Sequence, residues 1–182
     1  TIIRQVGDIG QMVDEFSSFA RMPAPDFRPE KLSTILEEAV FLQKVGHPDI
    51  LYELDDELSG SLCNLDPPQV TRVFTNLLQN AADSIEGRVG DPETLEEGRI
   101  SIHLKEDETQ LIAEIIDNGR GLPDENRARL TEPYVTHREK GTGLGLAIVR
   151  KIIENTGGKI YFESISGEGT TFYIELPRAD QA

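Results

Sequence analysis

Cysteine and basic residues are scarce in this chain. Its single cysteine, Cys63, cannot form an internal disulfide and is typical of a reducing compartment. Lys and Arg number 18 against 33 Asp and Glu, which leaves a net charge of −15 at pH 7. Since such a chain repels polyanions, we expect no nucleic-acid partner and no binding to an anionic membrane surface.

Long hydrophobic runs and clustered histidines are also missing. No apolar stretch approaches the ~18 residues that cross a membrane, and no signal peptide is visible. Because the sequence starts at Thr1 rather than Met, we expect a fragment of a longer protein. We expect this part to be cytoplasmic, with membrane attachment only through missing upstream segments. His47, His103 and His137 are scattered and lack the spacing of a metal site.

The first 22 residues predict a helix of a coiled coil or helical bundle. Their apolar residues recur at alternating steps of four and three, which is a heptad seam: Ile2, Val6, Ile9, Val13, Phe16 and Ala20. The alternative is a helix packed on its own domain. Prolines in residues 23–26 block the helix from continuing and indicate a linker. Residues 27–178 then predict one globular domain, followed by a tail at 179–182.

Within that domain the hydrophobic periodicity predicts helices and strands in mixed order. Helices are expected at 32–44, 67–85 and 143–155, and strands at 50–54, 61–65, 100–104, 111–116, 159–163 and 171–176. Ser33 is a plausible cap for the first helix, and Pro67 suits the first turn of the second. We expect an α+β fold, a two-layer sandwich of a mixed β-sheet with helices on one face.

Residues 140–150 run from a glycine-rich turn straight into a helix. Glycines let the backbone curl with its N–H groups inward, and the helix start adds partial positive charge. Together these features favour polyphosphate binding, although the spacing is neither the Walker pattern nor the dinucleotide fingerprint. The alternative is a glycine-rich hinge. The candidate binding residues are Lys140, Gly141, Thr142, Gly143, Leu144, Gly145 and Leu146.

Two asparagines in the predicted helix 67–85 are further candidates. Asn76 and Asn80 are four residues apart and therefore share a face. They lie among the residues of the apolar stripe, where an amide without a partner is costly. Amide oxygens are ligands for Mg²⁺, so the pair is a candidate for binding metal and phosphate. The alternative is a hydrogen bond between two helices.

The strand at 111–116 leads into the sequence Asp-Asn-Gly-Arg-Gly at 117–121. A carboxylate at the end of a buried strand is able to accept from the exocyclic amine of adenine, which makes Asp117 a candidate. Gly119 and Gly121 let a base approach the backbone. The alternative is a hairpin with an Asn-Gly turn, although no matching strand follows within a few residues. Later in the chain Thr170 offers a hydroxyl to the adenine edge through water, or else belongs to a simple β-turn.

Residues 119–142 make an unusually long connection, and such loops in compact domains are usually functional or mobile. We expect this segment to form a lid over the nucleotide. Arg138 or Lys140 within it is a candidate to neutralise the terminal phosphates. The alternative for both is a solvated loop charge.

The succession of these motifs resembles the N, G1, F, G2 and G3 boxes of the sensor histidine kinase catalytic domain. That domain shares its fold with Hsp90, the MutL proteins and the type II topoisomerases, and the likeness covers roughly residues 27–177. Residues 1–22 resemble the second helix of the dimerisation and phosphotransfer hairpin of the same kinases. The stretch Met12-Val-Asp-Glu-Phe-Ser-Ser-Phe-Ala-Arg-Met-Pro23 is similar to the NtrY-type kinases of nitrogen regulation.

This resemblance implies ATP and Mg²⁺ as cofactors. It implies that Asp117 reads adenine, that Asn80 binds Mg²⁺ and that Asn76 supports Asn80. There are departures: Leu130 and Tyr134 stand where phenylalanines are frequent, and Asp83 stands where many relatives carry a basic residue.

The implied activity is transfer of the ATP γ-phosphoryl group to a histidine and then to a response-regulator aspartate. The implied partners are a receiver domain and a second copy of the kinase, joined through the helical hairpin. The acceptor histidine belongs on a hairpin helix that would precede Thr1, so this chain is not expected to phosphorylate itself. Three rivals remain open. One is an ATPase of the Hsp90/MutL class, which needs a catalytic carboxylate near Asn80. The others are a serine-kinase anti-sigma factor and a nucleotide-binding dimerisation module.

Overall fold

A computed structural model describes residues 22–91, 95–122 and 144–179, together with Gly10, Val13 and Ser17. These three residues are helical and exposed, in line with the predicted N-terminal helix, and the rest of its heptad seam lies outside the described residues. In the described part of the chain, no helix combines the length and the apolar character that a membrane span needs.

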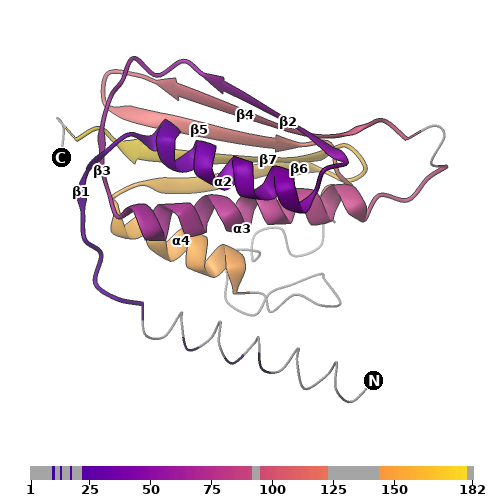
Figure 1. Ribbon diagram of the computed structural model, residues 1–182, viewed down its shortest axis with the longest axis horizontal. Helices are drawn as coiled ribbons and strands as arrows, with labels where there is room; N and C mark the ends of the chain where they lie inside the picture. Colours follow the sequence, from indigo (N-terminus) through magenta and orange to yellow (C-terminus); the bar gives the residue numbers. More distant parts are fainter. Residues whose placement is uncertain are drawn as a thin grey trace.

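A five-stranded mixed sheet forms one layer of the domain (Figure 1). Its strands are β2 (Ile50–Asp56), β4 (Gly98–Glu106), β5 (Gln110–Asp117), β6 (Lys159–Ile165) and β7 (Gly169–Pro177). Their order across the sheet is β2-β4-β5-β7-β6. β2 pairs with β4 in parallel, and the other pairs are antiparallel. The predicted strands are therefore confirmed, and β5, which ends in Asp117, is the central strand.

A small second sheet was not predicted. β1 (Arg28–Glu30) pairs antiparallel with β3 (Cys63–Leu65), and Cys63 also bridges to Arg178. β3 is shorter than the predicted strand 61–65. Burial raises the pKa of the Cys63 thiol to about 12, so this cysteine is an unreactive core residue.

Three helices in the described ranges cover one face of the sheet, as predicted (Figure 1). They are α2 (Leu32–Gly46), α3 (Pro67–Glu86) and α4 (Gly145–Asn155). α3 begins with two prolines, and its N-terminus is capped by Asp66, whose side chain accepts from the Gln69 N–H at 3.1 Å. The cap expected at Ser33 is wrong, because α2 already includes Leu32 and has no side-chain cap.

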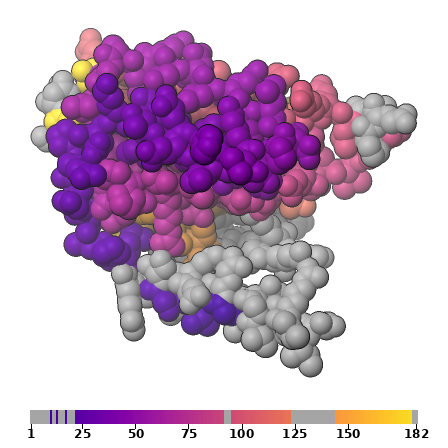
Figure 2. All heavy atoms as spheres, viewed as in Figure 1, coloured from indigo at the N-terminus to yellow at the C-terminus, as the bar shows by residue number. Residues whose placement is uncertain are grey.

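The hydrophobic core lies between the two layers. Alternate residues of β4, β5 and β7 point at the helices and are buried: Ile100, Ile102, Leu104, Leu111, Ala113, Ile115, Phe172, Ile174 and Leu176. They meet the apolar stripe of α3, in which Val73, Phe74, Leu77 and Leu78 are fully buried. Each such side chain stabilises the fold by roughly 1.5–3 kcal/mol. In Figure 2 the atoms of α2 and α3 cover much of the sheet from the side viewed. The same alternation turns Asp117 toward the helices.

Candidate functional site

Three polar side chains form a row across the end of the sheet. Asp117 on β5 pairs with Thr170 on β7, and Thr170 pairs with Ser164 on β6. Residues directly opposite on neighbouring strands share a face, so all three side chains lie on the helix-covered side. All three are buried, with exposed fractions of 5%, 5% and 8%. Figure 1 shows β5, β7 and β6 side by side.

The Asp117 carboxyl is held from its own loop. The Gly119 N–H donates to Asp117 Oδ1 at 2.8 Å. Burial raises the pKa of this carboxyl from 3.8 to about 6, against smaller opposing contributions from the Gly119 N–H, the Ser84 hydroxyl and the Thr170 backbone. The Ser84 Oγ lies beside this carboxyl, is buried, and has no protein hydrogen bond of good geometry. A buried carboxyl beside a hydroxyl without a partner is typical of a binding site.

Two glycines of the 117–121 loop occupy positions where a side chain would overlap neighbouring atoms. A Cβ on Gly119 would overlap the Ser84 hydroxyl and lie 2.6 Å from Asp117 Oδ1. Gly121 has φ +67°, and a Cβ there would overlap the Ile165 carbonyl oxygen. Glycine is therefore required at both positions by close approach, and at 121 also by the left-handed backbone.

This loop is joined to the turn before β7. The Gly167 N–H donates to the Arg120 carbonyl oxygen at 2.8 Å, and the Arg120 N–H donates to the Ser84 carbonyl oxygen at 3.1 Å. Two loops far apart in the sequence are thus fixed to each other and to α3. The hairpin alternative for residues 117–121 is excluded, because β5 pairs with β4 and β7.

Asn76 and the start of α4 lie together. The α3 and α4 helices pack on each other, and a Cβ on Gly145 would lie 3.4 Å from the Asn76 Oδ1. Asn76 and Asn80 are both half-buried on α3. The spacing that predicted a shared face for the two amides therefore brings one of them against the glycine-rich segment.

The N-terminus of α4 has the features of an anion-binding helix start. Leu144 precedes the helix, is fully buried and provides no side-chain cap, while its carbonyl oxygen accepts from the Ile148 N–H at 2.9 Å. The first N–H groups of such a helix point along its axis. Leu146 is half-buried against the core. The remaining candidates of this segment lie outside the described residues: Arg138, Lys140, Gly141, Thr142 and Gly143.

Two buried serines were missed by the sequence reasoning. Ser84 lies beside Asp117 and Gly119. Ser164 hydrogen-bonds to the Gly169 carbonyl oxygen at 2.9 Å and to Thr170 Oγ1 at 3.0 Å. Ser84 follows Asn80 by one helical turn, which was a usable signal. Ser164 carried none, since it owes its position to the pairing of β6 with β7.

No cluster of three or more His, Cys, Asp or Glu side chains able to bind a metal occurs among the described residues. His47 Nδ1 lies 2.8 Å from Glu86 Oε1, and His103 Nδ1 lies 3.6 Å from Asp55 Oδ2.

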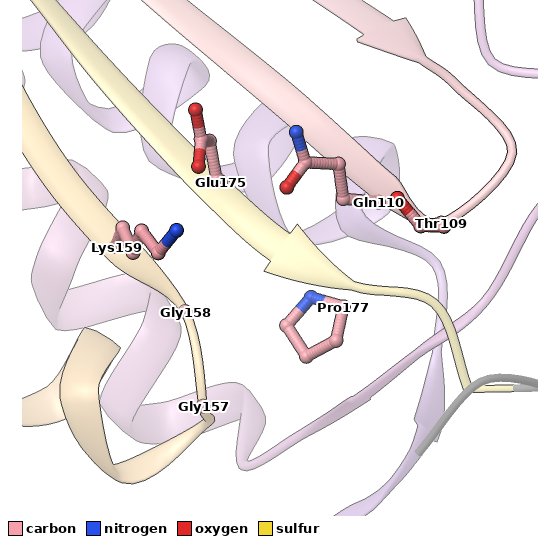
Figure 3. Close-up of a pocket in the computed structure, with 7 residues that line it drawn as sticks. All are labelled: Thr109, Gln110, Gly157, Gly158, Lys159, Glu175 and Pro177. Atoms are coloured by element: carbon pink, nitrogen blue, oxygen red, sulfur yellow. The ribbon is translucent and has the colours of Figure 1, made fainter.

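A surface pocket of about 350 Å³ lies at the other end of the sheet (Figure 3). Residues around it include Gln110 at the start of β5, Lys159 at the start of β6 and Glu175 on β7. Gln110 and Asp117 are the two ends of one strand. The pocket contains none of the predicted site residues and is unrelated to the row at Asp117.

The family model and the similar proteins found by sequence comparison agree with one another. Residues 65–180 match the sequence model of the family described as "Histidine kinase-, DNA gyrase B-, and HSP90-like ATPase". The nitrogen regulation protein NtrY of Azorhizobium caulinodans is 50% identical over 177 residues, which are 97% of this chain and 22% of that protein. A putative NtrY-like sensor histidine kinase of Rickettsia felis is 36% identical, over 96% of this chain and 28% of that protein. The chain thus spans about a quarter of the length of these relatives.

Solved structures of histidine kinases have the same fold. The catalytic domain of histidine kinase ThkA superposes with a TM-score of 0.71 at 29% identity, covering 84% of this chain and 98% of that chain. A complex of ThkA with the response regulator protein TrrA superposes with a TM-score of 0.75 at 24% identity, covering 98% of this chain and 49% of that chain.

Proposed function

Because the chain belongs to the histidine kinase-, DNA gyrase B- and HSP90-like ATPase family and is the catalytic ATP-binding domain of a sensor histidine kinase, we propose that the row at Asp117 is where it holds the adenine of ATP. The observation that carries this proposal is the buried Asp117 carboxyl beside Gly119, where any side chain would overlap it. A buried acceptor is costly unless a donor meets it, and the exocyclic amine of adenine is such a donor.

The phosphates are expected nearer the N-terminus of α3, where Asn76 and Asn80 continue the helix stripe that carries Ser84. The N–H groups at the start of α4 and the amides of Asn76 and Asn80 supply donors and hard oxygens without any positive field from the whole chain, whose net charge is −15. Asn80 would hold Mg²⁺ together with the phosphate oxygens. When bound, the ion neutralises charge on the phosphates as the γ-phosphoryl group leaves. Arg138 and Lys140 are proposed as further phosphate contacts.

In the intact protein the γ-phosphoryl group would pass to a histidine outside this chain. The imidazole nitrogen forms the N–P bond, the bond between the γ-phosphorus and the bridging oxygen breaks, and ADP leaves. His47 follows the last residue of α2 and His103 lies on β4, so neither stands on an exposed helix face. Catalysis by this domain is then mainly positioning and charge neutralisation.

Partners and location follow from the same assignment. The receiver domain of a response regulator would take the phosphoryl group from the histidine, and the N-terminal helix would complete a dimeric hairpin. The similarity to a kinase that was solved with its response regulator supports this arrangement. The intact protein would be a membrane-attached sensor with this part in the cytoplasm, which is also the setting expected from one reduced, buried cysteine.

Isothermal titration calorimetry with ADP and Mg²⁺ tests the nucleotide site. We expect one ADP per chain, and the substitution Asp117→Asn should weaken binding roughly tenfold to a hundredfold, because a mismatched buried group costs ~1–3 kcal/mol. Glu114→Gln is the matched control, since Glu114 lies on the same strand but on its opposite face. Equal ADP affinity in Asp117→Asn and the parent would remove Asp117 from the site.

A further inference from the structure

The Ser164 hydroxyl connects three parts of the proposed adenine site. The Leu122 N–H donates to Ser164 Oγ at 2.8 Å, Ser164 Oγ donates to the Gly169 carbonyl oxygen at 2.9 Å, and Ser164 Oγ lies 3.0 Å from Thr170 Oγ1. Leu122 belongs to the segment that follows Asp117, whereas Gly169 and Thr170 begin β7. Ser164 itself is buried, so water does not compete for these bonds.

The direction of the bond to Thr170 follows from the number of protons. A serine hydroxyl has one proton to donate and two lone pairs that accept. A carbonyl oxygen only accepts, so the Ser164 proton is directed to Gly169. An amide N–H only donates, so one lone pair of Ser164 is used by Leu122. The contact with Thr170 must then be a hydrogen bond in which Thr170 donates and Ser164 accepts.

This direction determines what Thr170 presents to a ligand. With its single proton directed to Ser164, the Thr170 hydroxyl has only lone pairs left. Thr170 lies directly opposite Asp117 on the neighbouring strand, and an ionised carboxylate is also purely an acceptor. The side chains of Asp117 and Thr170 therefore accept hydrogen bonds from a ligand and donate none.

We propose that Ser164 is a specificity-determining positioning residue, which fixes the Thr170 hydroxyl as an acceptor and so favours a base with an amine at this edge over one with a carbonyl oxygen. The inference rests on the proposed adenine site. The amine of adenine donates to these acceptors directly or through an ordered water. The carbonyl oxygen of hypoxanthine cannot donate, so it would face the lone pairs of Asp117 and Thr170 without a hydrogen bond. A site built to hydrogen-bond a donor rejects an analogue that lacks it, because its buried polar groups are left unpaired.

The test compares ADP with inosine diphosphate, which differs at this edge of the base. Calorimetry would be done at pH 8, above the Asp117 pKa of about 6. We expect the parent to prefer ADP by about tenfold or more, and Ser164→Ala to reduce that preference by about threefold or more, because the freed Thr170 hydroxyl turns and donates to the carbonyl oxygen. Ser101→Ala is the matched control, since Ser101 is a strand serine that bonds Glu53 on the opposite face of the sheet.

The ratio of affinities separates this role from a structural one. Losing the bond to Leu122 would weaken both nucleotides equally, so an unchanged preference in Ser164→Ala overturns the inference. If Ser164→Ala does not fold, Thr170→Val tests the same claim. It keeps the shape but removes the acceptor, so its preference for ADP should also fall, and an unchanged preference would contradict us. If the parent binds neither nucleotide, the proposed function fails before the inference is reached.

Discussion

Gly169 lies directly against the backbone of Asp117. A Cβ on Gly169 would overlap the Asp117 carbonyl oxygen, and Gly169 has φ +128°, a backbone angle that side chains rarely allow. The turn before β7 is thereby pressed onto the end of β5, where Thr170 pairs with Asp117. Gly169 therefore shapes the site by letting the two backbones approach closely.

The first prediction concerns this contact. Gly169→Ala should lower the free energy of unfolding by roughly 3 kcal/mol or more, because it combines a disfavoured backbone angle with an overlap against main chain. Gly167→Ala is the control: Gly167 has φ +86° but nothing within 4 Å of a Cβ. That control should lose only ~1–2 kcal/mol. Urea unfolding of the variants measures both, and equal losses would show that the close approach does not matter.

The second prediction concerns pH and folding. Burial raises the pKa of Asp117 from 3.8 to about 6, so the folded chain binds this proton more tightly than the unfolded chain. The protonated carboxyl therefore contributes stability that is present below pH ~4 and is lost as the pH rises to about 6. The cost above that pH is roughly 3 kcal/mol.

Asp117→Asn should remove this dependence without removing the fold. We expect the free energy of unfolding of the variant, measured without nucleotide, to equal or exceed that of the parent at pH 8. The difference between variant and parent should shrink as the pH falls from 6 to 4. A variant that is less stable than the parent at pH 8 by several kcal/mol would mean that the ionised carboxylate is satisfied in the folded chain.

The third prediction is that ADP binds the ionised form of Asp117. Affinity should fall as the pH drops through about 6, because a protonated carboxyl loses acceptor capacity. Since the phosphates of ADP also titrate in this range, the parent must be compared with Asp117→Asn under the same conditions. The ratio of their affinities should approach one at acid pH. A constant ratio from pH 5 to 8 would contradict the proposed role.

The fourth prediction concerns Mg²⁺. Asn80→Ala should weaken ATP binding in the presence of Mg²⁺ and have less effect in EDTA, because the amide oxygen is proposed to act through the metal. Asn80→Asp keeps a hard oxygen at the position and should retain most of the Mg²⁺ dependence. A loss of equal size in both buffers would point to folding, which a circular dichroism melt would reveal.

Local patterns were sufficient to predict most of the fold. The stripe of α3 and the alternation of β4 and β7 are strong periodic signals, and tertiary packing agrees with them. β1 was missed because Arg-Pro-Glu has no strand pattern of its own and is extended only through its pairing with β3. The end of β2 was predicted two residues early, since Asp55 and Asp56 continue the pairing with β4 despite their low strand propensity.

The site could be predicted only where glycine or amide spacing marked it. Asp117, Gly119 and Gly121 stand in one short motif, and Thr170 follows another. Ser164 becomes part of the row only through the register of β6 on β7, which puts it opposite Thr170. Which serine faces which strand depends on pairing across the sheet, and a single sequence does not contain that information.

Phosphotransfer in trans tests the central claim most directly. The chain would be incubated with γ-labelled ATP, Mg²⁺ and a separate helical hairpin that carries an acceptor histidine, and acid-labile phosphate would be measured on each. We predict label on the hairpin histidine and none on this chain. At ATP concentrations below the Kd of the parent, transfer should fall roughly tenfold or more in Asp117→Asn but not in Glu114→Gln. Label on His47 or His103 of this chain, or transfer that survives Asp117→Asn unchanged, would contradict the account.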